Sequence, residues 1–203
     1  MKIGILSIQG DFAAHAATLH TLGAQSLEVR TISDLHKSDA LILPGGESTT
    51  QLQFLQEEGL FDAIRQFAAK GRPIFGTCAG AILLATHVKN PPQPSLALLD
   101  MTVLRNGYGR QLASDVFFGP TTLKKDPLEM VFIRGPIIES VAPGITVLAN
   151  LNGSPTLVQK NNVLAATFHP ELTSDPTVHQ HFLSLLSSCT PTTKSKHAKS
   201  PRL

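Results

Sequence analysis

The sequence has no tryptophan, a single tyrosine and only two cysteines in 203 residues. So few aromatic rings argue against a surface that stacks nucleic-acid bases. Cys78 and Cys189 do not make the dense disulfide framework of small secreted proteins, which favours a reduced, cytoplasmic setting. No apolar run approaches the length of a membrane span, and Met1 leads straight into a strand-like segment. We therefore expect neither contact with a membrane nor a signal peptide.

The formal net charge of +2 is concentrated at one end of the chain. Residues 189–203 hold four of the 17 basic residues and no acid, which leaves 13 basic against 15 acidic residues elsewhere, or −2. No basic stripe indicates a nucleic-acid partner. Because residues 189–203 also lack the apolar side chains needed to fold, we predict a disordered basic tail there. The length suits one α/β domain, over residues 1–188.

Strand-like and helix-like segments alternate in the first half of the chain. Short apolar runs predict strands over 2–8, 26–31, 40–43 and 73–76. Helical spacing predicts helices over 11–22, ended by Gly23, and over 49–69, which Gly59 can interrupt. This alternation predicts a mostly parallel sheet with helices on both faces.

The pattern changes after a proline-rich loop at 90–94. Short strands separated by turn residues are predicted over 101–104, 114–118, 130–133, 145–149, 155–159 and 163–168. An amphipathic helix is predicted over 177–187. We expect these strands to be antiparallel additions to the sheet and not a second domain.

The segment Gly-Thr-Cys-Ala-Gly at 76–80 places Cys78 between an apolar strand and an apolar helix. Small flanking residues suit a tight turn, and the helix start directs free N–H groups and partial positive charge toward the sulfur. Such an environment favours the reactive thiolate. The pattern is a cysteine version of the strand–turn–helix elbow that exposes a nucleophile. The alternative is a buried, inert cysteine, the commoner fate of free thiols.

Two further motifs bear on the chemistry. His169-Pro170-Glu171 follows an apolar run, which suits a general base whose tautomer is held by a carboxylate, although a surface loop is the default interpretation. The paired glycines Gly45 and Gly46 follow a strand and precede a helix, where a backbone N–H can turn toward a ligand. Such an N–H can form an oxyanion hole with that of Ala79. The Gly-Lys-Ser/Thr ending of a phosphate loop is missing, and a helix cap at Ser48 or Thr49 is compatible with either role.

Together these motifs resemble the class I, triad-type glutamine amidotransferases, and within them the glutaminase subunits of pyridoxal 5′-phosphate synthase. The resemblance covers roughly residues 1–187, with the motifs in the expected order. The cysteine elbow and His-Pro-Glu are shared by the wider class. The Gln-Gly pair at 9–10, the Gly-Glu-Ser-Thr loop at 46–49 and the segment 105–111 indicate the narrower group. The matching segments are residues 6–11, 44–49, 76–80, 105–111, 132–136 and 168–171.

The resemblance implies a flavodoxin-like, three-layer α/β fold with an open sheet and a catalytic triad of Cys78, His169 and Glu171. Cys78 would attack the carboxamide of L-glutamine, His169 would move the proton, and Glu171 would orient His169. The backbone N–H groups of Gly46 and Ala79 would form the oxyanion hole. The residues implied to bind L-glutamine are Gly46, Glu47, Ser48, Arg105, Ile133 and Arg134. A surface ion pair is the alternative role for the two arginines.

The resemblance also implies a partner, a (β/α)8-barrel synthase subunit that receives ammonia. Gln9 and Gly10 would lie at the interface with it, where docking would complete the oxyanion hole. Ala14, which precedes His15, and residues 112–116 depart from the family pattern, which bears on the details of that interface. The glutaminase reaction needs no cofactor, and the spacing of cysteines, histidines and acids predicts no metal site.

Two alternatives stay open. One is a glutaminase of another amidotransferase, such as that of imidazole glycerol phosphate synthesis, which the segment 105–111 disfavours. The other is a non-catalytic or stress-response α/β protein with a cysteine elbow, which the set of Cys78, His169 and Glu171 disfavours.

Overall fold

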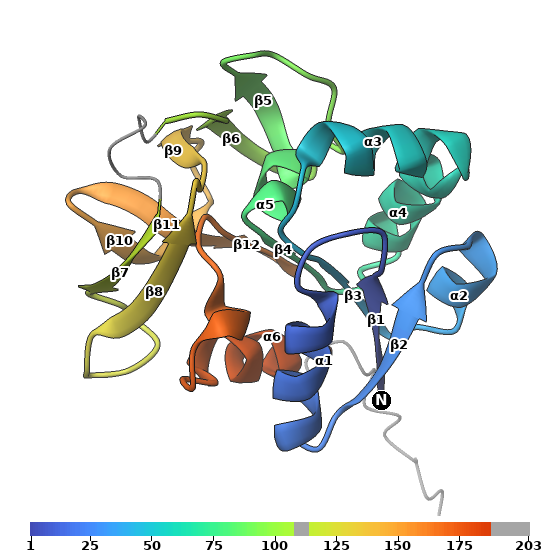
Figure 1. Cartoon of the computed structure of the whole chain (residues 1–203), viewed down its shortest axis with the longest axis horizontal. Coiled ribbons are helices and arrows are strands. Elements are labelled where there is room, and N and C mark those ends of the chain that lie inside the picture. The colour runs from blue at the N-terminus through green and yellow to red at the C-terminus, as the bar shows by residue number, and fades with distance from the viewer. Residues whose placement is uncertain (108–113, 188–203) are drawn as a thin grey trace, which may run out of the picture.

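The computed structural model describes residues 1–107 and 114–187, and their centre is one seven-stranded sheet (Figure 1). Its strand order is β10-β11-β12-β4-β3-β1-β2. From β12 to β2 all neighbours are parallel, whereas β10, β11 and β12 pair in antiparallel fashion. The predicted mostly parallel sheet with antiparallel additions is therefore confirmed. Its strands are β1 (Lys2–Leu6), β2 (Gln25–Val29), β3 (Ala40–Leu43), β4 (Ile74–Thr77), β10 (Thr146–Leu151), β11 (Ser154–Lys160) and β12 (Val163–Ala166).

Helices cover both faces of this sheet, which gives three layers. In Figure 1, α1 and α6 lie below the sheet and α3, α4 and α5 lie above it. Two apolar clusters match these layers, one including Leu19 of α1 and Phe182 of α6, the other including Leu55, Ile64 and Leu83 from the opposite layer. The helices are α1 (Phe12–Thr21), α2 (Ile32–His36), α3 (Ser48–Glu57), α4 (Leu60–Ala69), α5 (Ala79–Leu84) and α6 (Thr177–Ser187).

The central strands are apolar on both faces because both faces are covered. In β3, Leu41 and Leu43 join the cluster under α3–α5, and Ile42 between them joins the cluster under α1 and α6. Successive side chains of a strand point to opposite faces, so a continuous apolar run is what a doubly covered parallel strand requires. This explains why the sequence marks these strands by short apolar runs without alternation.

Not all of the predicted later strands join the main sheet. A three-stranded sheet is formed by β5 (Ala85–Lys89), β6 (Leu99–Leu104) and β9 (Ile137–Val141), and a separate pair by β7 (Ser114–Gly119) and β8 (Leu128–Ile133). The expectation that all these strands extend the central sheet is wrong for β6, β7 and β8, and β5, β9 and α2 are not predicted at all. β5 is missed because it begins directly where α5 ends, and the apolar run continues across that boundary without a turn residue to mark it.

The interruption predicted at Gly59 in the helix over 49–69 is confirmed: φ is +68° there, and α3 gives way to α4. One predicted boundary changes near the site. The strand predicted over 163–168 ends at Ala166, so that Thr167 and Phe168 lead out of the sheet toward His169. The short helix η2 (Pro170–Leu172), which is also not predicted, follows at once.

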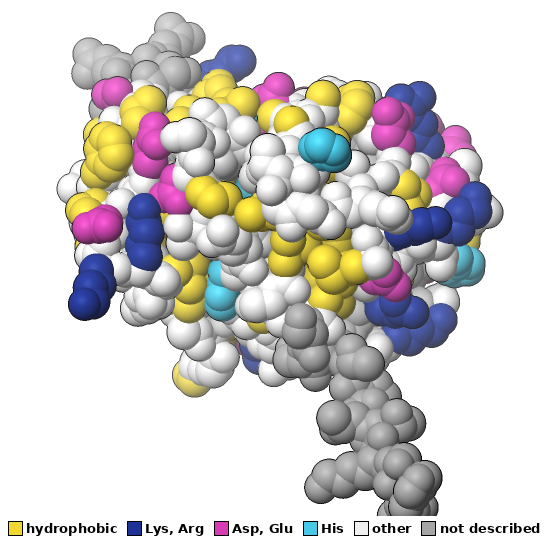
Figure 2. Space-filling view, turned by 90° about the horizontal axis from the view of Figure 1, so that it is seen from below, with side chains coloured by type: hydrophobic (Ala, Val, Ile, Leu, Met, Phe, Trp, Pro, Cys, Tyr) yellow, Lys and Arg dark blue, Asp and Glu magenta, His cyan; other side chains and the backbone are white. Residues whose placement is uncertain are grey.

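Charges on the lower face of the molecule are mixed. In the space-filling view of Figure 2, basic and acidic side chains are interspersed near the edges, while the middle of this face is largely apolar or uncharged. Among the side chains described there, no basic stripe crosses the face. Within residues 1–107 and 114–187, no helix is long and apolar enough to cross a membrane.

Candidate active site

Cys78 lies at the junction of β4 and α5, in a backbone conformation that few non-glycine residues adopt. Its φ is +48°, and its N–H donates to the carbonyl of Ala166 at 2.9 Å. A Cβ at Gly76 would lie 2.6 Å from the carbonyl of Gly80, so a larger residue does not fit there. Held strain of this kind is typical of functional turns, and it is the geometry expected of a nucleophile elbow.

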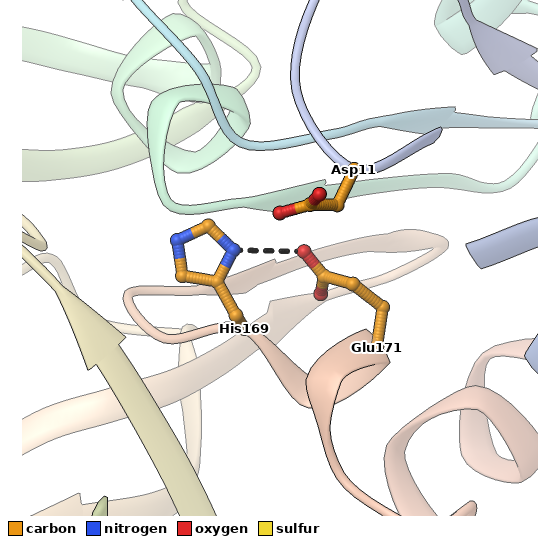
Figure 3. A group of neighbouring side chains, drawn as sticks. All are labelled: Asp11, His169 and Glu171. Atoms are coloured by element: carbon orange, nitrogen blue, oxygen red, sulfur yellow. Dashed lines mark hydrogen bonds and ion pairs between the residues drawn. The ribbon is translucent and has the colours of Figure 1, made fainter. Parts of the chain in front are cut away.

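His169 and Glu171 are joined by a hydrogen bond. His169 leaves the end of β12 with its N–H donated to the carbonyl of Val131 at 2.8 Å, and Glu171 lies in η2. Nδ1 of His169 is 2.8 Å from Oε1 of Glu171, and both side chains are buried (Figure 3). Glu171 thus lies where it can set the tautomer and orientation of the imidazole.

The charge state of His169 follows from these neighbours. Burial lowers the pKa of His169, but hydrogen bonds to Cys78 and Glu171, and their negative charges, outweigh it and raise the pKa to about 10. The imidazolium form is therefore favoured at neutral pH. A protonated imidazole beside a cysteine is the arrangement that a thiolate nucleophile requires.

A cavity of about 380 Å³ opens between these elements, a size suited to a small molecule. Cys78, His169 and all six residues predicted to bind glutamine line it, together with Gly10, which we expected at a partner interface. Three further lining residues, Asp11, Ile82 and Asn106, were not predicted. Asp11 and Asn106 belong to the matching segments 6–11 and 105–111, which is the one indication the sequence offers. The lining residues predicted for glutamine are Gly46, Glu47, Ser48, Arg105, Ile133 and Arg134.

Several of the lining side chains are held by neighbours. Nη2 of Arg105 lies 2.8 Å from Oε1 of Glu47, and the Ser48 hydroxyl donates to Oε1 of Gln93 at 3.0 Å. Gln93 belongs to the proline-rich loop at 90–94, so this loop supports the site. Arg134 is exposed, has φ of +47°, and has no acidic partner within ion-pair distance among the residues that the structure describes.

The turn that carries Gly46 is connected to the end of β1. Gly46 has φ of +134°, which favours glycine. Nε2 of Gln9 donates to the carbonyl of Glu47 at 2.8 Å, and the Cα of Gly10 lies against the carbonyl of Gly45 with no room for a Cβ. Gln9 does not line the cavity. Ala79, the other predicted oxyanion residue, follows Cys78 at the start of α5 and is buried.

Asp11 lies beside the His169–Glu171 pair, and one potential ligand atom from each of the three lies within 4.8 Å of the others (Figure 3). These residue types can bind a metal ion. However, Nδ1 of His169 and Oε1 of Glu171 already bond to each other, so an ion bound between them would displace that hydrogen bond. The prediction that the site works without a metal stays a prediction. Residues 108–111 of the matching segment lie outside the described residues.

The open α/β sheet, the cysteine elbow and the His–Glu pair at one cavity are those of a triad-type glutamine amidotransferase. The comparison with family models agrees with this class. The chain belongs to the SNO glutamine amidotransferase family, whose model matches residues 5–188.

Similar proteins include two named pyridoxal 5′-phosphate synthase subunit PdxT. The one from Koribacter versatilis is 49% identical over 92% of this chain and 96% of its own length, and the one from Solibacter usitatus is 50% identical over 91% and 99%. A crystal structure described as a glutamine amidotransferase is 42% identical, has a TM-score of 0.86, and covers 91% of this chain and 98% of its own. Another glutamine amidotransferase, from Thermotoga maritima, shares the fold at 15% identity and a TM-score of 0.60, over 92% of this chain and 84% of its own.

Proposed function

We propose that this chain hydrolyses L-glutamine to L-glutamate and ammonia and delivers the ammonia to a synthase subunit that makes pyridoxal 5′-phosphate. The observation that carries the proposal is that Cys78 and His169 line one cavity, and that His169 is hydrogen-bonded to the buried Glu171. The family and the names of its relatives support delivery of ammonia to this synthase over delivery to the imidazole glycerol phosphate synthase. The few cysteines support a cytoplasmic setting.

The reaction starts with the thiolate. The Cys78 sulfur attacks the carboxamide carbon, and the backbone N–H groups of Gly46 and Ala79 stabilise the oxyanion that forms. The imidazolium of His169 then gives its proton to the amide nitrogen, the C–N bond breaks, and ammonia leaves. Water attacks the resulting thioester while His169 takes its proton, which releases glutamate and restores the thiolate.

The α-carboxylate of the substrate binds to Arg134. Arg105 is already paired with Glu47, whereas Arg134 is exposed on the cavity and has no acidic partner among the described residues. A guanidinium can form two parallel hydrogen bonds with a carboxylate. Glu47 places a carboxylate on the same wall, where it can meet the α-ammonium group.

The partner is a (β/α)8-barrel subunit, and Gln9 and Gly10 lie at the interface with it. These residues touch the turn that carries Gly46, so a partner that moves them acts directly on the oxyanion hole. Direct delivery has a chemical advantage, because free ammonia is mostly protonated at neutral pH and the ammonium ion is not nucleophilic. Docking that completes the oxyanion hole raises kcat more than it lowers KM.

The test is glutamate release from L-glutamine by wild type and Cys78→Ala, each with and without the synthase subunit. We expect release that depends on the partner and is lost in the variant. Equal release with and without the partner would contradict activation by docking while leaving the catalytic cysteine intact. No release in either condition, with a synthase that binds the chain, would contradict the glutaminase function itself.

A further inference from the structure

Behind Glu171 lies a pair of buried histidines that the glutaminase mechanism does not use. His15 in α1 and His179 in α6 both have no exposed surface, and Nδ1 of His15 lies 2.9 Å from Nε2 of His179. Nε2 of His15 lies 3.3 Å from Oγ1 of Thr77 and 3.4 Å from Oε2 of Glu171. A line of polar groups therefore runs from α6 through α1 to the carboxylate that holds His169.

Both histidines are neutral at physiological pH. Burial, together with the charges of His179 and His169, lowers the pKa of His15 well below its usual value. Burial lowers the pKa of His179 to about 4. A neutral imidazole carries a single N–H, so one hydrogen must be shared across the 2.9 Å contact between the two rings.

Two placements of that hydrogen are possible, and their costs differ. If His15 donated it, the bare Nε2 of His15 would face the Glu171 carboxylate, and the Nδ1–H of His179 would be buried with no partner in the described chain. If His179 donates it, Nε2–H of His15 can donate to Thr77 and places its positive end 3.4 Å from Oε2 of Glu171, and only an acceptor of His179 is left without a partner. A buried donor without an acceptor is the rarer and costlier case. The second placement is therefore favoured.

We propose that His15 is a positioning residue for glutamine hydrolysis: its Nε2–H holds the second oxygen of Glu171, and His179 fixes the tautomer that makes this possible. Oε2 of Glu171 is buried and has no hydrogen bond of regular geometry, so this contact is what restrains the carboxylate on that side. Restraining the carboxylate keeps Oε1 aligned on Nδ1 of His169, and thus Nε2 of His169 toward the thiol. Because His15 is neutral, it restrains the Glu171 carboxylate without forming an ion pair that would compete with the one between Glu171 and His169.

The titratable groups that face His15 are His179 from α6, Glu171 from η2, and His169 at the start of η2. Thr77 at the end of β4 is the only other polar side chain that bonds to it among the described residues, and Phe75 packs edge-on against both histidine rings. The arrangement thus spans four elements, α1, α6, η2 and β4, which meet beside the cysteine elbow.

The inference rests on the proposed function, and its test compares His15→Leu with His15→Gln in the presence of the synthase subunit. Gln can place an amide N–H near the position of Nε2, whereas Leu fills the space without a donor. Loss of this orienting polar contact is expected to lower kcat roughly tenfold in His15→Leu, with KM changed less than about twofold. His15→Gln is expected to recover most of kcat. His20→Leu, on the exposed side of the same helix, is the matched control.

A second measurement separates this inference from the function on which it rests. The rate of alkylation by iodoacetamide as a function of pH, measured in a Cys189→Ser background so that only Cys78 can react, reports on the Cys78–His169 pair without any substrate. We expect the profile to shift in His15→Leu and to return toward wild type in His15→Gln. Identical profiles for the three proteins, or equal loss of kcat in both variants, would overturn the role of His15. No hydrolysis by wild type together with a shifted profile would overturn the glutaminase function and leave the positioning role standing.

Discussion

Arg105 and Glu47 form an ion pair on the wall of the cavity, with Nη2 of the arginine 2.8 Å from Oε1 of the glutamate. The arginine side chain is only 12% exposed, whereas the glutamate side chain is 58% exposed. The pair joins residues 58 positions apart, one before α3 and one after β6. The guanidinium of Arg105 is therefore occupied before any substrate arrives.

Glu47→Gln should weaken glutamine binding with little effect on stability. The change removes the partner of Arg105 and the charge facing the substrate ammonium, so we expect KM to rise about fivefold to tenfold, in line with the loss of one charge-assisted hydrogen bond. A half-exposed ion pair contributes less than about 1 kcal/mol to the free energy of unfolding. Steady-state kinetics and thermal unfolding measure both effects. Asp39→Asn, which breaks the distant exposed pair with Arg72, is the control, and an unchanged KM in Glu47→Gln would remove Glu47 from the binding site.

Arg134 offers a way to separate binding from backbone strain. Because its φ is +47°, Arg134→Gly should relieve strain and leave the protein at least as stable as wild type. The same change should raise KM for glutamine by roughly tenfold or more, because the α-carboxylate loses its cation. Arg134→Lys should fall between, since an ammonium cannot form the paired bonds of a guanidinium. If Arg134→Gly binds glutamine as well as the exposed-site control Arg65→Ala, another group holds the carboxylate.

Gly76→Ala should disturb the elbow. Its Cβ would meet the backbone of Gly80 at 2.6 Å and Cδ1 of Leu84 at 2.7 Å, so β4 and α5 would have to move apart. Overpacking of this kind costs about 1–3 kcal/mol. Both the melting temperature and kcat should fall, because Cys78 lies between the displaced segments. Gly144→Ala has open space around the added Cβ and φ of +87°, so it measures the cost of backbone strain without overpacking. A melting temperature of Gly76→Ala equal to that of wild type would show that the elbow tolerates the methyl group.

The buried histidines predict a loss of stability in mild acid. The usual pKa of His179 is 6.5, and burial lowers it to about 4. Between pH 6.5 and pH 4, His179 is therefore protonated in the unfolded chain and neutral in the folded chain. The contribution of His179 to the free energy of unfolding is complete above pH 6.5 and is lost as the pH falls toward 4, an effect on the order of 3 kcal/mol. His15 acts in the same direction.

His179→Leu should therefore flatten the dependence of the unfolding free energy on pH between about 6.5 and 4, whatever it does to stability at pH 7. Urea unfolding at a series of pH values measures the slope. His36→Leu, at an exposed site, should keep the wild-type slope. A slope in His179→Leu equal to that of wild type would place the acid sensitivity elsewhere.

The raised pKa of His169 works in the opposite direction. A group whose folded pKa lies near 10 stabilises the folded state fully below pH 6.5, and this contribution is lost as the pH rises toward 10. Because Cys78 is one of the two groups that raise the pKa of His169, Cys78→Ala should lose less unfolding free energy than wild type as the pH rises toward 10.

The parts of the fold that local patterns encode are the ones the sequence predicts well. The apolar run of β3, the helical spacing of α1 and the small residues around Cys78 are properties of neighbouring residues, so they are visible without any tertiary contact. The separate sheet of β5, β6 and β9 is different. Its strands pair across tens of residues, and a β-strand's pattern does not specify its partner.

The site divides in the same way. Cys78 at its elbow and the sequence His169-Pro170-Glu171 follow from motif and spacing, and the family that they indicate is confirmed. Gln93 beside Ser48 and His15 behind Glu171 have no local indication of a role, and the motif that contains Asp11 does not indicate its place beside His169. Each meets its neighbour only because segments far apart in the sequence pack together.

The amino-acid sequence by itself determined the class of fold, the cysteine elbow and the family, because each depends on short-range periodicity, turn chemistry or contiguous motifs. Only the tertiary structure decided which charges are already paired, which loop holds Ser48, and which buried groups surround the His169–Glu171 pair. Those properties arise from the packing of β1, β4, η2 and α6 against one another. Burial and distance set the charge of an imidazole or a carboxylate, and neither can be read from residues that are far apart along the chain.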